Sequence, residues 1–99
     1  MRLFSFEKLK VWQKSRNLSI LIYRITKLFL DDERFGLISQ MRGCVISISS
    51  NIVEGTGRHT AKDEARFTEI AYSAALELLN KAILSNDLEF LTNENYEHI

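Results

Sequence analysis

The sequence has no proline, four glycines and one cysteine among its 99 residues. Because proline interrupts helices and glycine supplies turns, this composition favours long helices over a turn-rich β protein. The single cysteine, Cys44, cannot form a disulfide within the chain. The N-terminal residues MRLFSFEKLK also lack the apolar core of a secretory signal. We therefore expect a cytoplasmic, all-α protein.

Charge is nearly absent from the middle of the chain. Between Leu37 and Val53 the only charged side chain is Arg42. The stretch is too short and carries too many polar side chains to span a bilayer, so a soluble protein must cover its apolar surface. We predict that it forms the central helix of a bundle, covered on several sides. Its main apolar stripe consists of Ile38, Met41, Val45, Ile48 and Ile52.

The same helix has a second face of small residues, Ser39, Gly43, Ser47 and Ser50. Small side chains allow another backbone to approach closely, so we expect contacts on both faces. Gly55 and Gly57 follow, and we expect them to end the helix with positive φ angles.

An amphipathic helix precedes this segment, from Leu9 to about Leu30. Trp12 and Tyr23 lie beside its apolar stripe and broaden it, and we expect Phe4 and Phe6 to fold back over the helix. The acidic residues 31–33 end this helix and cap the next one. Its apolar stripe consists of Val11, Leu18, Ile22, Ile25 and Phe29.

A third helix begins after Thr60, which forms a capping-box-like start with Asp63 and Glu64, and reaches Ser85 or Asn86. It carries two apolar stripes, one more than a lone helical hairpin needs. The first consists of Phe67, Ile70, Ala71, Ala74, Leu78 and Ala82. The second consists of Ala65, Tyr72, Leu76, Leu79 and Ile83.

A fourth helix is capped by Thr92, with Leu91 and Tyr96 as a hydrophobic staple, and has about two turns before Ile99. These elements predict one all-α domain over residues 1–99: an antiparallel up-down four-helix bundle with a truncated fourth helix. The short fourth helix leaves the second stripe of the third helix uncovered. We therefore predict a homo-oligomer whose interface consists of Tyr72, Leu76, Leu79 and Ile83.

The basic residues are concentrated at the N-terminus, although the whole chain is neutral. Residues 1–30 contain seven basic side chains and one acidic one. This asymmetry permits an anion-binding face that contacts phosphates of RNA or DNA, and the alternative, which charge alone favours, is that it complements the acidic remainder of the chain or of another subunit. The candidate nucleic-acid-binding residues are Lys8, Lys10, Lys14, Arg16, Arg24, Lys27 and Arg58.

No pattern in the sequence predicts catalysis, a cofactor or a metal. His59 and His98 lack helical partners at metal-ligand spacing, and Cys44 has no catalytic motif nearby. Glu54 and Arg58 flank a glycine turn, where a structural ion pair is favoured over a phosphate site. We predict a structural polar network that fixes helix register or a subunit contact. Its candidate members are Gln40, Arg42, Asn51, Glu54 and Glu77.

Five blocks of the chain carry a family resemblance: FEKLKVWQKS, YRITKLF, FGLISQMR, SISSNIVEGTGR and RFTEIAYSAALEL. Their order and separation resemble the family of ribosomal RNA intervening-sequence proteins. The resemblance implies an antiparallel four-helix bundle that assembles into homo-oligomers, with a five-subunit ring expected. It also implies bacterial genes, some inside inserts within large-subunit rRNA genes. A related branch, the accessory variability proteins of diversity-generating retroelements, works with nucleic acid and a reverse transcriptase.

Two functions follow as expectations. The first is a non-enzymatic, homo-oligomeric scaffold or accessory factor associated with RNA or DNA. The alternative is a protein–protein interaction module without nucleic-acid binding, whose third helix receives a partner helix. Neither involves a membrane or a small-molecule substrate, and an enzyme built in the bundle core is disfavoured.

Overall fold

The computed structural model of the protein describes residues 4–30 and 34–99. Its elements are η1 (Ser5–Lys8), α1 (Lys10–Thr26), η3 (Arg34–Ile38), α2 (Ser39–Thr56), α3 (Ala61–Asp87) and α4 (Asn93–His98). All regular structure in the described part of the chain is helical, which confirms the predicted all-α fold with three long helices and a short fourth one. The expected cap at residues 31–33 lies outside the described residues.

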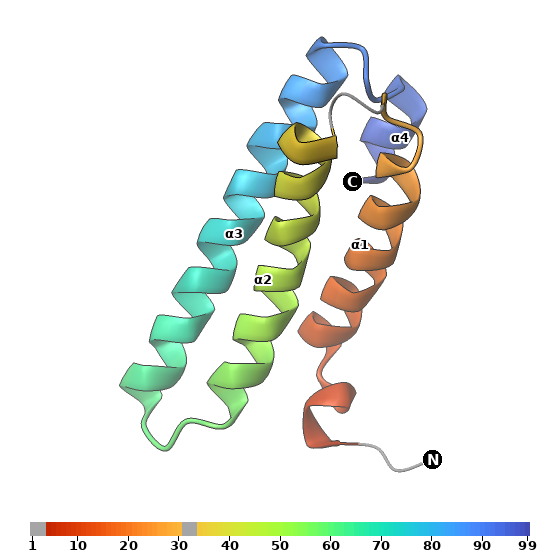
Figure 1. The fold of residues 1–99 in the computed structure, drawn as a ribbon. Coiled ribbons are helices and arrows are strands. Elements are labelled where there is room, and N and C mark those ends of the chain that lie inside the picture. Colours follow the sequence, from red (N-terminus) through yellow and green to blue (C-terminus); the bar gives the residue numbers. More distant parts are fainter. Residues whose placement is uncertain (1–3, 31–33) are drawn as a thin grey trace.

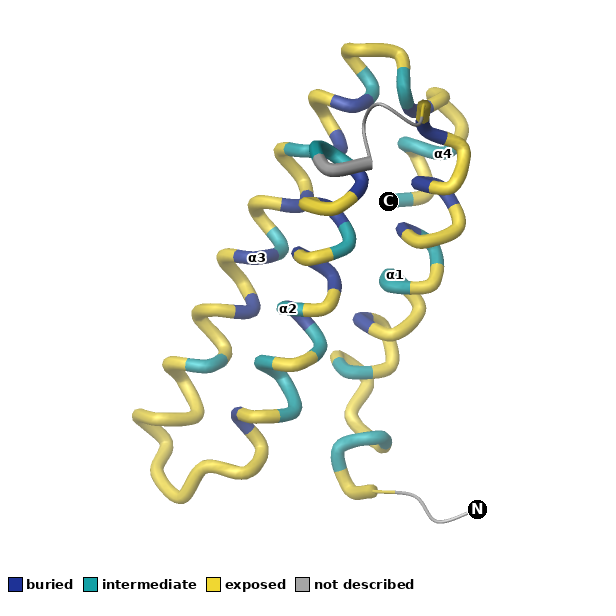
Figure 2. Tube along the Cα trace, viewed as in Figure 1, coloured by how far each residue is buried: buried dark blue, intermediate teal, exposed yellow. Residues whose placement is uncertain are grey.

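The three long helices lie side by side, with α2 between α1 and α3 (Figure 1). In that view the chain rises through α1, descends through α2 and rises again through α3, and α4 lies near the last turns of α1. Buried positions gather where the helices face one another, and the outward turns are exposed (Figure 2). The position of α2 therefore agrees with the prediction that the weakly charged segment is central.

The core is built from the predicted stripes. Ile38 at the end of η3 and Met41, Val45 and Ile48 of α2 are buried, and Ile52 packs against them as a half-buried residue. Ile22 and Ile25 of α1 and Ala74, Leu78 and Ala82 of α3 complete the same cluster. Two stripe members differ from the prediction, because Val11 and Ile70 are exposed. Both lie in halves of their helices that α4 does not reach.

The first helix ends at Thr26 and not at Leu30. The Thr26 hydroxyl donates to the Ile22 carbonyl at 2.7 Å, and the amide of Phe29 donates to the Thr26 carbonyl at 3.2 Å. This tighter turn directs Phe29 into the core, where its ring centroid lies 6.0 Å from that of Phe90, and leaves Leu28 and Leu30 exposed. The chain therefore buries the Phe29 ring in the core and does not continue α1 by another turn.

The expectation of positive φ at Gly55 and Gly57 is wrong. Gly57 has φ −90°, and no glycine in the described part of the chain has a positive φ. Helix α2 continues through Gly55, which is buried. A Cβ there would lie 3.4 Å from the Phe67 Cβ and 3.6 Å from the Glu64 carbonyl oxygen. Glycine at this position therefore allows the first turns of α3 to approach α2 closely.

The small-residue face of α2 is open in the single chain. Ser39, Gly43 and Ser50 are exposed, and Ser47 is half-buried. A Cβ at Gly43 would meet nothing within 4 Å. The expected close backbone contact on this face is absent among the described residues, because α1 and α3 pack against the apolar stripe of α2.

Helix caps occur where the sequence predicts them. The Thr60 and Thr92 side chains accept hydrogen bonds from the amides of Asp63 and Asn95, each at 3.1 Å. After α3 the chain reverses at Glu89 (φ 64°), and the amides of residues 90 and 91 donate to the Ser85 carbonyl. This reversal buries Leu91 and brings Tyr96 against the core, as the predicted staple requires.

Replacing the cap residue with Thr60→Ala is expected to lower the free energy of unfolding by about 1 kcal/mol, because one amide of the first turn of α3 loses its acceptor. For a domain of this size the thermal midpoint falls by about 4–8 °C. Thermal unfolding followed by circular dichroism measures the shift. Thr60→Ser keeps the acceptor and is the control; an equal loss in both variants would contradict the capping role.

Candidate functional site

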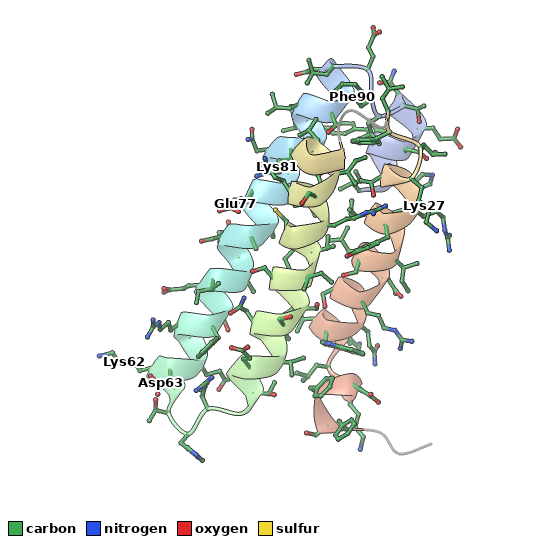
Figure 3. The ribbon with its side chains drawn as sticks, in the orientation of Figure 1. Lys27, Lys62, Asp63, Glu77, Lys81 and Phe90 are labelled. Atoms are coloured by element: carbon green, nitrogen blue, oxygen red, sulfur yellow. The ribbon has the colours of Figure 1, made fainter. Side chains whose placement is uncertain are left out.

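The basic residues at the N-terminal side form an exposed set. Lys8 lies in η1, four of the predicted cations lie on α1, Lys27 directly follows it, and all six are exposed. Lys27 points away from the bundle (Figure 3). Only Arg16 has a local partner, since its guanidinium lies 5.8 Å from the centre of the Trp12 ring. The remaining five form no side-chain hydrogen bond or ion pair with another described residue: Lys8, Lys10, Lys14, Arg24 and Lys27.

Arg58 does not belong to this surface. It lies in the turn between α2 and α3, where its Nη2 is 4.0 Å from an Oε of Glu54 and its guanidinium lies 4.3 Å from the centre of the Phe67 ring. The ion pair expected between Glu54 and Arg58 is therefore present, and its structural role stays a prediction. Because its charge already faces a carboxylate and a ring, Arg58 is less available to a phosphate than the α1 cations.

The five residues of the predicted polar network are divided among separate places. Asn51 donates to the carbonyl and hydroxyl oxygens of Ser47, one turn earlier in α2. Glu54 faces Arg58, and Gln40 and Glu77 line a groove between α2 and α3. The hydrogen bonds and ion pairs of the described residues do not join these five side chains into one network.

Arg42 connects α2 to α1 and not to the other predicted network members. Its Nε donates to the Thr26 hydroxyl at 2.9 Å, and its Nη2 donates to the Tyr23 carbonyl at 3.3 Å. The guanidinium also lies 4.6 Å from the centre of the Tyr23 ring. A cation at the last turn of a helix satisfies free carbonyl groups and the negative end of the helix dipole. Arg42 therefore holds the C-terminal turn of α1 against α2.

A groove of about 240 Å³ lies between α2 and α3 on the side of the small residues. Its lining residues are Gln40, Gly43, Cys44, Ser47, Ala74, Glu77 and Lys81. Burial raises the pKa of the Cys44 thiol, the Lys81 ammonium opposes this rise, and Glu77 adds to it. The Cys44 side chain is therefore a protonated and weakly nucleophilic thiol at neutral pH. Among the described residues, no group of three or more His, Cys, Asp or Glu side chains is placed to hold a metal ion.

Two hollows lie beside aromatic residues of α1. The first, of about 360 Å³, is formed where the start of α1 meets the second half of α2. Its lining residues are Phe6, Trp12, Ser49, Ser50, Val53 and Glu54. The second, of about 330 Å³, lies further along α1. Its lining residues are Ser19, Ile20, Tyr23, Arg24 and Lys27.

The sequence analysis assigns Trp12 and Tyr23 only to apolar packing. Their spacing could also have indicated a binding surface, because these rings share one side of the helix with Arg16 and Lys27. The α2 part of the first hollow carried no such signal, since residues 49–54 are distant in sequence.

The second stripe of α3 is uncovered, as the sequence predicts for a single chain. Tyr72, Leu76, Leu79 and Ile83 are between 41% and 66% exposed. The short α4 lies at the other side of the layer, close to the end of α1. Four large apolar side chains in a row on one helix exceed the isolated exposed residues that are normal at a protein surface.

Comparison with known proteins gives one family. The model of the 23S rRNA-intervening sequence protein family matches residues 7–99. No curated protein matches the chain. In the described part of the chain, no helix combines the length and apolar character that crossing a membrane requires.

Proposed function

Because the chain belongs to the 23S rRNA-intervening sequence protein family, we propose that it is a non-enzymatic, homo-oligomeric accessory protein that associates with RNA through α1. The single observation that carries the RNA part is the set of exposed, unpaired cations along one helix. Each cation that contacts a phosphate releases a condensed counterion, so binding is favourable at low salt although the whole chain is neutral. The resemblance to oligomeric relatives makes a five-subunit ring the assembly to test first.

The exposed stripe of α3 supports the oligomeric part of the proposal. Burying an exposed large apolar side chain completely contributes about 1.5–3 kcal/mol. Because about half of each of these four is already covered, a second copy that covers the rest gains roughly 3–6 kcal/mol toward the entropy cost of association. The same stripe also favours a second candidate function: an interaction module that receives an amphipathic helix of another protein and binds no RNA. The two candidate functions differ in whether the α1 cations contribute to ligand binding.

Reversing the charge of the α1 cations with Arg24→Glu and Lys27→Glu is expected to weaken RNA binding at least tenfold at low salt. The slope of log affinity against log salt concentration becomes shallower by about 1.4, since two phosphate contacts of a single strand are lost. Fluorescence anisotropy of a short, labelled single-stranded rRNA fragment, titrated at several salt concentrations, measures both quantities.

The matched control is Lys62→Glu with Arg66→Glu, which makes the same change in net charge on α3. Lys62 points outward at the edge of the bundle opposite to Lys27 (Figure 3). We expect this control to keep most of the affinity and the original salt slope. Equal losses in the two variants would reduce the effect to net charge, and absence of RNA binding by the unaltered protein at low salt would favour the interaction module.

A further inference from the structure

Aromatic and cationic side chains alternate along one side of α1. With about 100° per helical residue, Trp12, Arg16, Tyr23 and Lys27 fall within an arc of about 60°. The contacts agree with this spacing, since Arg16 lies over Trp12 and Arg42 of α2 lies over Tyr23. We call these four residues and Arg42 the aromatic–cationic stripe.

Each ring of the stripe borders one of the two hollows. Trp12 lines the first with Phe6, whose ring stands edge-on to it at a centroid distance of 5.2 Å. Tyr23 lines the second, between Ile20 and the two free cations Arg24 and Lys27. Both hollows are partly open to solvent. Cations line the second hollow directly, and Arg16 lies over the Trp12 ring that borders the first.

We propose that this side of α1 binds single-stranded RNA, with unpaired bases packed against Trp12 and Tyr23 and phosphates contacted by Arg16, Arg24 and Lys27. This inference rests on the proposed RNA association and names the form of nucleic acid that the site takes. Aromatic rings with interleaved cations bind single strands because every base has a face to stack and every nucleotide has a phosphate.

The polar residues of the first hollow fit the edge of a base. Ser49 and Ser50 of α2 supply hydroxyl groups that donate or accept, and Glu54 supplies a carboxylate that accepts from an amino group. An exposed carboxylate repels phosphate, so a base and not the backbone faces this wall. The Glu54 carboxylate lies 4.0 Å from the Arg58 guanidinium, and it can still accept a hydrogen bond from a base.

Double-stranded RNA does not fit the same surface. In a duplex the base faces are stacked inside the helix, and its outer surface presents phosphates, ribose hydroxyls and groove edges. A duplex would use the cations of the stripe and would offer no base face to Phe6, Trp12 or Tyr23. The rings therefore give the stripe a preference for unpaired strands.

The test uses the intrinsic fluorescence of Trp12, the single tryptophan of the chain. The unaltered protein is titrated with an oligoadenylate strand, an abasic strand of the same length and charge, and a duplex RNA. We expect the oligoadenylate to quench Trp12 and to bind at least fivefold more tightly than the abasic strand, in line with about 1–3 kcal/mol per stacked base. The duplex binds more weakly than the oligoadenylate and leaves the Trp12 emission unchanged.

A pair of variants tests the contribution of the first hollow. Phe6→Leu removes one of its rings and keeps Trp12 as the reporter, and Phe6 lies outside the main core cluster. Leu84→Ala, on a face of α3 outside the proposed interface, removes an exposed apolar side chain elsewhere. We expect the preference for oligoadenylate over the abasic strand to fall in the Phe6 variant and to persist in the Leu84 variant.

The outcomes separate this inference from the proposed function. Equal affinity for the oligoadenylate and the abasic strand, with no quenching, overturns the base-binding stripe and leaves phosphate-mediated RNA association standing. A tighter duplex complex overturns the preference for single strands in the same way. Absence of binding to all three probes at low salt overturns the proposed RNA association itself.

Discussion

A variant with Leu76→Glu and Leu79→Glu is expected to be a monomer at concentrations where the unaltered protein is oligomeric. The two side chains lie at the centre of the exposed α3 stripe, about half of each being exposed in the single chain. Because only that half is left for an interface to bury, losing one leucine removes about 1 kcal/mol from the interface, and placing carboxylates there adds a desolvation cost. The combined change lowers the association constant by more than a hundredfold.

The matched control is Leu84→Glu with Leu88→Glu. Leu84 is exposed on another face of α3, and Leu88 is the exposed residue that follows the helix. Multi-angle light scattering and sedimentation over a range of concentrations measure the assembly of both variants. The α3-stripe interface is contradicted if the stripe variant remains oligomeric while the control dissociates. A monomeric unaltered protein contradicts the homo-oligomer as a whole.

The second large effect concerns the core of the single chain. Ile22→Ala is expected to lower the free energy of unfolding by about 3 kcal/mol, because Ile22 is completely buried in the core cluster and truncation leaves a cavity. The corresponding fall in the thermal midpoint is about 12–24 °C for a domain of this size. Chemical and thermal unfolding, followed by circular dichroism, measure the loss.

Ile20 provides the control, because it has the same side chain on the same helix but is 48% exposed. Ile20→Ala is expected to cost less than about 1 kcal/mol. Both variants are compared at one protomer concentration, since assembly would shift the apparent stability. Equal losses would show that α1 does not pack on α2 with the face that buries Ile22.

The family match and the exposed cations answer different questions: the match gives the family, and the cations concern what the chain binds. The match places the chain in its family over residues 7–99 and is consistent with the helical fold. It leaves the ligand to be argued from the surface, where α1 carries the unpaired positive charge and α3 carries the uncovered apolar stripe. These surfaces lie on helices that flank α2 on either side (Figure 1). The cations and the apolar stripe are therefore separate surfaces of the single chain.

The sequence by itself determined the local features of this protein, namely its helix caps and apolar stripes. The threonine caps of α3 and α4, the apolar stripe of α2 and the two stripes of α3 were all predicted, because each depends on residues within one or two helical turns. The candidate site was predicted only in part. The exposed cations of α1 follow from helical periodicity, and the uncovered stripe of α3 follows from its second apolar face.

Only the packing of the helices decided which residues contact one another across helix boundaries. Arg42 was expected in a network with other α2 and α3 residues, yet it binds Thr26 and the Tyr23 carbonyl of α1. Gly55 was expected to turn the chain, yet it admits α3 at close range. The hollow beside Trp12 requires residues 49–54 of α2. Such contacts depend on the rotation and separation of whole helices, which are set by the sum of many side-chain contacts and not by any short stretch of sequence.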